Sequence, residues 1–238
     1  EHMMHSHFSL IWESVADAVP EHIALIQGER RITWRNYEDR AARLAQGLID
    51  AGLGHDSKVG MYLYNSPEYA ETNFAAMKIG GVPINVNYRY LDEELHYLLE
   101  NADIEALVFH SSLGDRVARV CDRLPMLKAM ICVDDGPAED GSMGPTNGVP
   151  YDIFLSQASG TARTQPKGDE IYMLYTGGTT GMPKGVMYPL DSFTEFFMRG
   201  FPPMIGLDPF ENADQFALAA RQMIDTNSAV VAMSGPPL

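Results

Sequence analysis

Apolar residues recur along the chain at two spacings, which separate expected helices from expected strands. Helical spacing predicts helices at 8–19, from a cap at Thr33 through Gly47, from Pro67 to about Ile79, at 91–102, around 117–124, and at 151–158, 193–198 and 213–223. Short apolar runs predict strands at 23–26, 31–33, 58–64, 82–86, 104–109, 129–133, 171–175, 186–188 and 229–233.

Between residues 58 and 133 the predicted strands and helices alternate. Such alternation is typical of an α/β fold, because a helix crosses the face of the sheet before the next parallel strand begins. Residues 134–150 are rich in glycine, proline and acids and predict an exposed excursion, since regular elements resume directly after them. We therefore expect an α/β fold with a largely parallel sheet flanked by helices.

One stretch, residues 175–186, reads Tyr-Thr-Gly-Gly-Thr-Thr-Gly-Met-Pro-Lys-Gly-Val between two apolar runs. Glycine lets the backbone approach an anion, so that successive N–H groups can point at one cluster of oxygens. Threonine hydroxyls and a lysine ammonium add side-chain donors. We interpret the stretch as a phosphate loop, with these candidate cofactor-binding residues: Thr176, Gly177, Gly178, Thr179, Thr180, Gly181 and Lys184.

The spacing excludes two common phosphate-binding motifs. A Walker A loop ends in Gly-Lys-Ser/Thr and leads into a helix, whereas here Pro183 precedes Lys184, Gly185 follows it, and residues 186–188 indicate a strand. The dinucleotide fingerprint Gly-x-Gly-x-x-Gly does not fit the stretch either. A strand, loop and strand are expected in place of a strand, loop and helix.

The stretch resembles the signature of acyl-adenylate-forming enzymes, which include acyl-CoA synthetases, luciferases and the adenylation domains of peptide synthetases. It departs from the family pattern at Gly177, where serine is common, and this loses one hydroxyl while leaving the backbone cradle. Residues 32–38 and 77–85 resemble two further segments of the family, which we interpret as scaffold. Residues 85–89, Asn-Val-Asn-Tyr-Arg, are typical of the acyl-CoA synthetase branch, and Arg89 is expected to be a surface or interdomain ion-pair residue.

The resemblance implies a two-step ligase that uses ATP, Mg²⁺ and coenzyme A on a small-molecule carboxylic acid. The carboxylate attacks the α-phosphate of ATP, and the coenzyme A thiol then displaces AMP from the acyl-adenylate. The resemblance implies that the loop holds the leaving β- and γ-phosphates, and that Lys184 is a point charge that need not be the catalytic lysine. The branch implied is that of bacterial fatty-acid or steroid-side-chain acyl-CoA synthetases.

The resemblance also sets an expectation for domain organisation. Residues 1–3 are expected to be a cloning remnant, and residues 4–238 the first part of the large N-terminal domain, with the phosphate loop at 175–186. The C-terminal lid domain and the downstream motifs that contact adenine, ribose and magnesium are not present. No catalytic residue and no metal ligand is therefore assigned, and this chain alone is not expected to form acyl-CoA.

Composition limits the partners and the cellular compartment that we expect for the protein. The chain has 238 residues, 45% of them hydrophobic, and a formal net charge of -15, so its long-range field disfavours nucleic acid. We interpret Cys121 and Cys132 as small core residues, which fits a reducing, cytoplasmic compartment. No apolar run reaches the roughly 18 residues needed to span a bilayer. The sequence does not determine the oligomeric state, and a homo-oligomer is compatible with it.

Two other functions are compatible with the sequence. An amino-acid or aryl-acid adenylation domain would share the loop, and the residues that distinguish its substrate would lie close to the end of this chain. A non-catalytic nucleotide-binding or scaffold module would also carry the loop without the downstream motifs.

Overall fold

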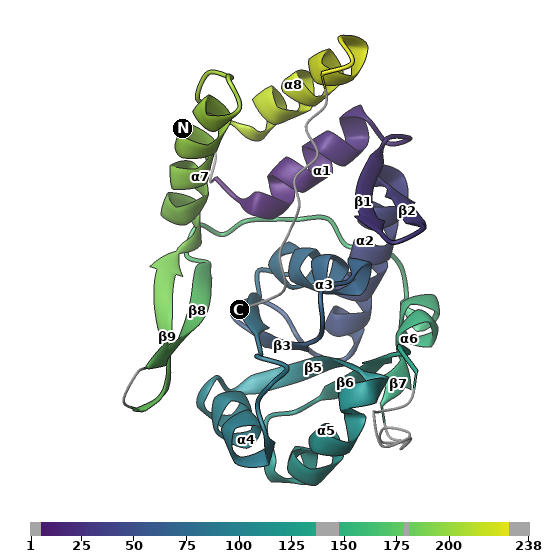
Figure 1. Ribbon diagram of the computed structural model, residues 1–238, viewed down its shortest axis with the longest axis vertical. Coiled ribbons are helices and arrows are strands. Elements are labelled where there is room, and N and C mark those ends of the chain that lie inside the picture. Colours follow the sequence, from purple (N-terminus) through teal and green to yellow (C-terminus); the bar gives the residue numbers. More distant parts are fainter. Residues whose placement is uncertain (1–5, 137–147, 179–180, 229–238) are drawn as a thin grey trace.

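The computed structural model describes residues 6–136, 148–178 and 181–228, and its centre is a parallel sheet (Figure 1). Five strands form this sheet in the order β4-β3-β5-β6-β7, and every neighbouring pair is parallel. The strands are β3 (Lys58–Tyr62), β4 (Val82–Asn85), β5 (Ile104–His110), β6 (Ala129–Val133) and β7 (Val149–Pro150). The predicted α/β fold with a largely parallel sheet is confirmed.

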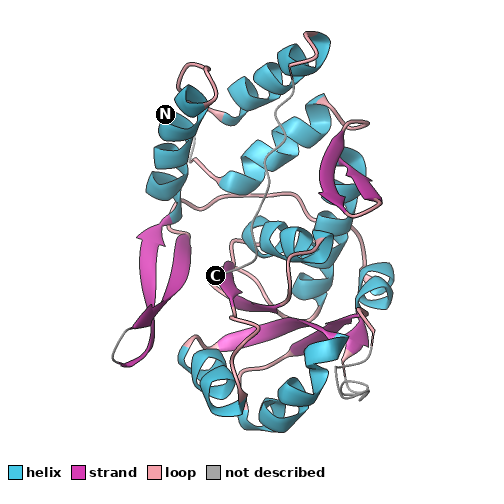
Figure 2. Ribbon diagram, in the orientation of Figure 1, coloured by secondary structure: helices cyan, strands magenta, loops and turns pink. Residues whose placement is uncertain are grey.

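Helices cover both faces of the sheet, which gives three layers (Figure 2). One face carries α2 (Trp34–Asp50), α3 (Pro67–Lys78) and α6 (Tyr151–Gln157), and the other carries α4 (Asp92–Asn101) and α5 (Gly114–Val120). The helix starts follow from local chemistry. The Thr33 side chain accepts from the Asn36 N–H at the start of α2, and the Ser66 side chain accepts from the Tyr69 N–H at the start of α3.

Strand β3 shows how the chain divides its side chains between two cores. Val59, Met61 and the following Leu63 join the buried cluster under α2 and α3, while Tyr62 joins the cluster under α4 and α5. Successive side chains of a strand point to opposite faces, so a strand covered on both faces is apolar almost throughout. This explains why the run predicted at 58–64 shows no polar alternation.

The remaining elements surround this centre. They are α1 (Phe8–Ala18), the antiparallel pair β1 (Ile23–Gln27) and β2 (Arg30–Thr33), short 3₁₀ helices at Ser111–Leu113 and Cys121–Arg123, the antiparallel pair β8 (Ile171–Gly178) and β9 (Gly181–Pro189), α7 (Leu190–Met204) and α8 (Ala213–Asp225). Helix α8 lies along α1, and α7 follows β9 directly (Figure 1). Among the described residues, no helix combines the length and apolar composition needed to cross a membrane.

Two predicted boundaries were wrong, and one prediction falls outside the described residues. Cys121 lies in a 3₁₀ turn and not in the α-helix before it. Helix α7 continues past residue 198 and contains Pro202. Proline has no N–H to donate to the Met198 carbonyl one turn earlier, and this carbonyl accepts instead from the Phe210 N–H at 3.0 Å. The strand predicted at 229–233 lies among the residues that the structure does not describe.

A buried ion-pair network joins α1, α2 and α3. The side chain of Lys78 is fully buried, and its Nζ lies 2.5 Å from Glu13 Oε1 and 2.7 Å from Glu38 Oε1. Glu13 Oε1 also accepts from the Thr164 N–H and hydroxyl, while Arg163 Nε lies 3.2 Å from Glu13 Oε2. One ammonium therefore compensates two carboxylates where little water reaches them.

Replacing this ammonium should destabilise the protein strongly. Lys78→Met keeps the apolar stem but leaves Glu13 and Glu38 without their shared cation, so we expect the free energy of unfolding to fall by about 3 kcal/mol. Urea denaturation measures this difference. Arg119→Met is the matched control, because Arg119 and its partner Asp92 are both exposed, and its loss should cost about 0.5 kcal/mol. Equal effects of the two substitutions would contradict this view of the network.

Candidate functional site

The glycine-rich stretch lies on the antiparallel hairpin formed by β8 and β9, outside the parallel sheet (Figure 1). The two strands pair from Ile171 with Pro189 to Gly178 with Gly181, and the register shifts between Thr176 and Gly178. The shift lies near Pro183, which has no N–H to donate to the ladder. The predicted order of strand, loop and strand is therefore confirmed. The strands are longer than predicted, because β8 reaches Gly178 and β9 begins at Gly181, so most of the predicted loop at 175–186 is paired strand.

The inner face of the hairpin packs against the core. Ile171, Met173 and Tyr175, at alternate positions of β8, contact the buried cluster that α4 and α5 share with the sheet. On the outer face, the paired rings of Tyr172 and Tyr188 stack on Phe193 of α7, with centroid distances of 4.7 and 5.3 Å. The base of the hairpin is thus held on both faces.

Gly185 is required by the ring of Tyr175. The two residues pair across the strands, and a Cβ built on Gly185 would lie 2.9 Å from Met173 Sδ and 3.2 Å from two ring atoms of Tyr175. The distance to Met173 is shorter than real Cβ contacts, and the distances to Tyr175 are tighter than most of them. The missing side chain therefore lets the Tyr175 ring lie directly over β9, close to the backbone of the motif.

The candidate donors Thr176 and Lys184 lie opposite each other in the hairpin, and both are exposed. Directly opposed residues of an antiparallel pair project to the same face, so the hydroxyl and the ammonium share one face. This face is opposite to the one that Tyr175 and Gly185 turn toward the core. Gly177 is next to Thr176, and Gly178 pairs with Gly181. Thr179 and Thr180 lie outside the described residues.

The structure adds two residues that sequence reasoning missed. Tyr175 Oη donates to Asn101 Oδ1 at 2.8 Å, and Tyr97 Oη donates to the Pro183 carbonyl at 3.3 Å. Tyr97 and Asn101 both lie on α4, among the polar residues of an amphipathic helix. The only signal available in the sequence was their spacing of one helical turn.

Two other candidate groups lie away from the motif. The Arg89 guanidinium stacks over the Tyr88 ring at 4.8 Å from its centroid, and no role in the site is assigned to it. His55, Asp169 and Glu170 bring possible metal ligands together at the base of β8, far along the hairpin from the loop. The carboxylate of Glu170 already accepts from the N–H groups of residues 167 and 168.

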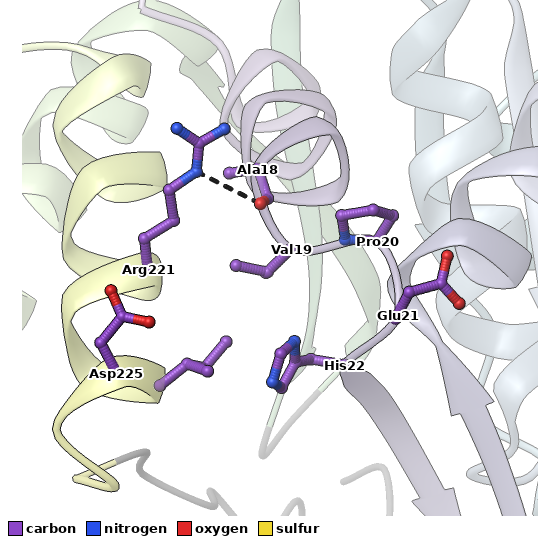
Figure 3. A pocket seen from close by; sticks show the side chains of 8 residues that line it. Ala18, Val19, Pro20, Glu21, His22, Arg221 and Asp225 are labelled. Atoms are coloured by element: carbon purple, nitrogen blue, oxygen red, sulfur yellow. Dashed lines mark hydrogen bonds between the residues drawn. The ribbon is translucent and has the colours of Figure 1, made fainter.

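Two hollows of the described surface lie away from the loop end of the motif. One, of about 290 Å³, lies between the end of α1 and α8, where Arg221 Nε donates to the Ala18 carbonyl at 3.2 Å and His22 and Asp225 line the wall (Figure 3). Another, of about 350 Å³, is apolar and lies beside Phe193 and Phe196. The candidate donors Thr176 and Lys184 thus lie on an exposed surface of the hairpin, apart from both hollows.

A parallel sheet with helices on both faces, carrying an exposed threonine and lysine on a glycine-rich hairpin, defines an α/β protein with a candidate polyphosphate site. The sequence matches the family model described as AMP-binding enzyme over residues 12–228. The chain belongs to this family.

Individual relatives agree with the family. A medium/long-chain-fatty-acid–CoA/3-oxocholest-4-en-26-oate–CoA ligase of Mycolicibacterium smegmatis is 37% identical over 227 residues, which are 95% of this chain and 40% of the relative. A 3-oxocholest-4-en-26-oate–CoA ligase of Rhodococcus rhodochrous is 41% identical over 177 residues, 74% of this chain and 32% of the relative. The chain therefore spans less than half the length of these curated relatives.

The fold agrees with a solved structure. The crystal structure of an anthranilate CoA ligase in complex with anthranoyl-AMP matches with a TM-score of 0.72 at 19% identity. The match covers 85% of this chain and 38% of that chain. At this identity the likeness supports the fold alone.

The close contact at Gly185 yields a prediction about the hairpin. Gly185→Ala places a Cβ against Met173 and Tyr175, and such overpacking should lower the free energy of unfolding by about 1–3 kcal/mol. Amide hydrogen exchange in β8 should become faster. Gly160→Ala is the control, because a Cβ there meets no atom within 4 Å. A Gly185→Ala protein with unchanged stability and exchange would contradict the close packing.

Proposed function

We propose that this chain provides the polyphosphate-binding part of an ATP-dependent acyl-CoA synthetase. The observation that carries the proposal is the hairpin, which presents Thr176 and Lys184 on one exposed face of a glycine-rich turn. Membership of the AMP-binding enzyme family and the ligase names of its relatives support the reaction class. The proposed site comprises Thr176, Gly177, Gly178, Thr179, Thr180, Gly181 and Lys184.

The proposed reaction has two steps. A carboxylate oxygen of the acid attacks the α-phosphorus of ATP, the bond to the β-phosphate oxygen breaks, and pyrophosphate leaves. The sulfur of coenzyme A then attacks the acyl carbon, and AMP leaves as the thioester forms. In the first step negative charge accumulates on the leaving pyrophosphate, so donors aimed at it lower the barrier.

The residues of this chain would act on that leaving group. The Lys184 ammonium supplies a compact positive charge, and the Thr176 hydroxyl supplies a neutral donor on the same face. Backbone N–H groups of the glycines add donors without a side chain in the way. The donors belong to a protein with a formal net charge of -15, so attraction of the polyphosphate depends on this local arrangement.

ATP would bind as its magnesium complex, since Mg²⁺ is commonly held by phosphate oxygens and few protein ligands. We assign no magnesium ligand, because the described acids are not gathered at the loop end of the hairpin. The relatives' names point to a fatty acid or a steroid side-chain acid as the substrate class. We also propose a cytoplasmic location, which is supported by the packing of Cys121 and Cys132 as small residues in or against the core.

The direct test is the affinity of the chain for MgATP. Lys184→Ala removes one charge-assisted contact, so we expect binding to weaken about tenfold in isothermal titration calorimetry. In an enzyme that contains this chain at the full length of its relatives, the same substitution should lower ATP–pyrophosphate exchange.

Lys167→Ala is the matched control, because Lys167 is an exposed lysine outside the motif and its loss changes the net charge equally. Its affinity should stay within about twofold of the unchanged chain, since charges beyond a Debye length are screened. Equal affinities for Lys184→Ala and the unchanged chain would remove the hairpin lysine from the proposed site.

A further inference from the structure

Helix α4 contacts the glycine-rich stretch on both strands of the hairpin, at Tyr175 and at Pro183. Tyr175 immediately precedes Thr176, and its hydroxyl donates to Asn101 Oδ1 at 2.8 Å. Pro183 immediately precedes Lys184, and its carbonyl accepts from Tyr97 Oη at 3.3 Å. The two hydrogen bonds therefore lie on either side of residues 176–182, one on each strand, and Lys184 directly follows the second of them.

The two partners on α4 form a single contact surface. Tyr97 and Asn101 are four positions apart in a continuous helix, so their side chains lie one above the other on the same face. The apolar residues Leu95, Leu98 and Leu99 of this helix are buried in the core. Helix α4 is thus fixed to the sheet and can act as a rigid reference for the hairpin.

The loop end of the hairpin depends on contacts with another element for a fixed position. An isolated two-stranded hairpin is marginally stable in water. At the base, Phe193 covers the outer face, whereas farther along the strands Leu174 and Val186 are 38% and 37% exposed. The described contacts that hold the loop end come from the inner face, through Tyr175 and the buried Pro183.

We propose that Tyr97 and Asn101 are positioning residues that hold both strands of the glycine-rich segment in the geometry that binds a polyphosphate. The proposal rests on the proposed function of the hairpin and assigns it a support on a separate element. Tyr97 and Asn101 do not touch the nucleotide. They act through Pro183 and Tyr175, and Gly185 contributes by leaving space for the Tyr175 ring.

Positioning of this kind changes affinity through the population of the competent state. If the segment leaves its anchored geometry for part of the time, the apparent dissociation constant rises in proportion to the lost population. The Lys184 ammonium and the glycine N–H groups would then have to be ordered at the moment of binding. The effect is expected without any loss of a donor to the ligand.

The experiment uses Tyr→Phe substitutions, which remove only a hydroxyl. Tyr97→Phe and Tyr175→Phe should each weaken binding of MgATP about threefold, and the double variant about tenfold. Amide hydrogen exchange at residues 176–178, 181, 182 and 184 should become faster in the same order, while exchange in the parallel sheet stays unchanged. Tyr188→Phe, in the same hairpin, is the control and should match the unchanged chain in both measurements.

A second pair of variants separates positioning from general stability. Asn101→Asp keeps an oxygen that accepts from Tyr175 Oη, so amide exchange should stay near that of the unchanged chain; the comparison is made on exchange, because the added negative charge also repels a polyphosphate. Asn101→Leu removes the acceptor and should reproduce the Tyr175→Phe result. Rescue by the acceptor alone is the signature expected of an anchor.

The outcomes also separate this proposal from the proposed function. If the unchanged chain binds MgATP and Lys184→Ala binds it more weakly, yet the double Tyr→Phe variant matches the unchanged chain in affinity and exchange, the anchoring proposal is wrong. If exchange at residues 176–178, 181, 182 and 184 rises in the double variant but the unchanged chain binds no MgATP, the anchoring is upheld and the proposed function fails. Faster exchange throughout the parallel sheet would also overturn the anchoring, because the hydroxyls would then stabilise the whole fold.

Discussion

The ring of Tyr175 lies over the bare backbone of Gly185, and the position of the candidate site depends on this contact. It presses the inner face of the hairpin against the core beside α4, and alternation along the strands then turns Thr176 and Lys184 to the opposite, exposed face. Packing and binding thus use alternate residues of the same strands. A side chain at Gly185 would disturb both, because moving the ring also moves the backbone next to the lysine.

Attraction of a polyphosphate to the hairpin depends on the donors that the hairpin itself carries. The protein as a whole is strongly acidic, and a polyanion gains nothing from its long-range field. The hairpin stands apart from the parallel sheet, and its donors are an ammonium, a hydroxyl and backbone N–H groups of glycines (Figure 1). Short-range hydrogen bonds, and not the net charge, must therefore provide affinity and orientation for a nucleotide.

Sequence patterns predicted the parallel sheet, its flanking helices and the strand–loop–strand motif, because each depends on periodicity or on local residue chemistry. The longer reach of α7 was missed because Pro202 suggests an end, whereas the Met198 carbonyl finds a donor in Phe210. Tyr97 and Asn101 were missed for a different reason. Their partners are 86 and 74 residues away, and polar residues on an amphipathic helix give no local sign of what they contact.

The central claim is that the glycine-rich hairpin of this AMP-binding family member is where a nucleotide polyphosphate binds. The most direct measurement is a titration of the ¹⁵N-labelled chain with MgATP, followed by the backbone amide chemical shifts. We expect the largest and saturable shifts at residues 176–178, 181, 182, 184 and 185, with smaller shifts at Tyr97 and Asn101. Shifts concentrated at the hollow between α1 and α8, around His22 and Arg221, with none in the hairpin, would contradict it.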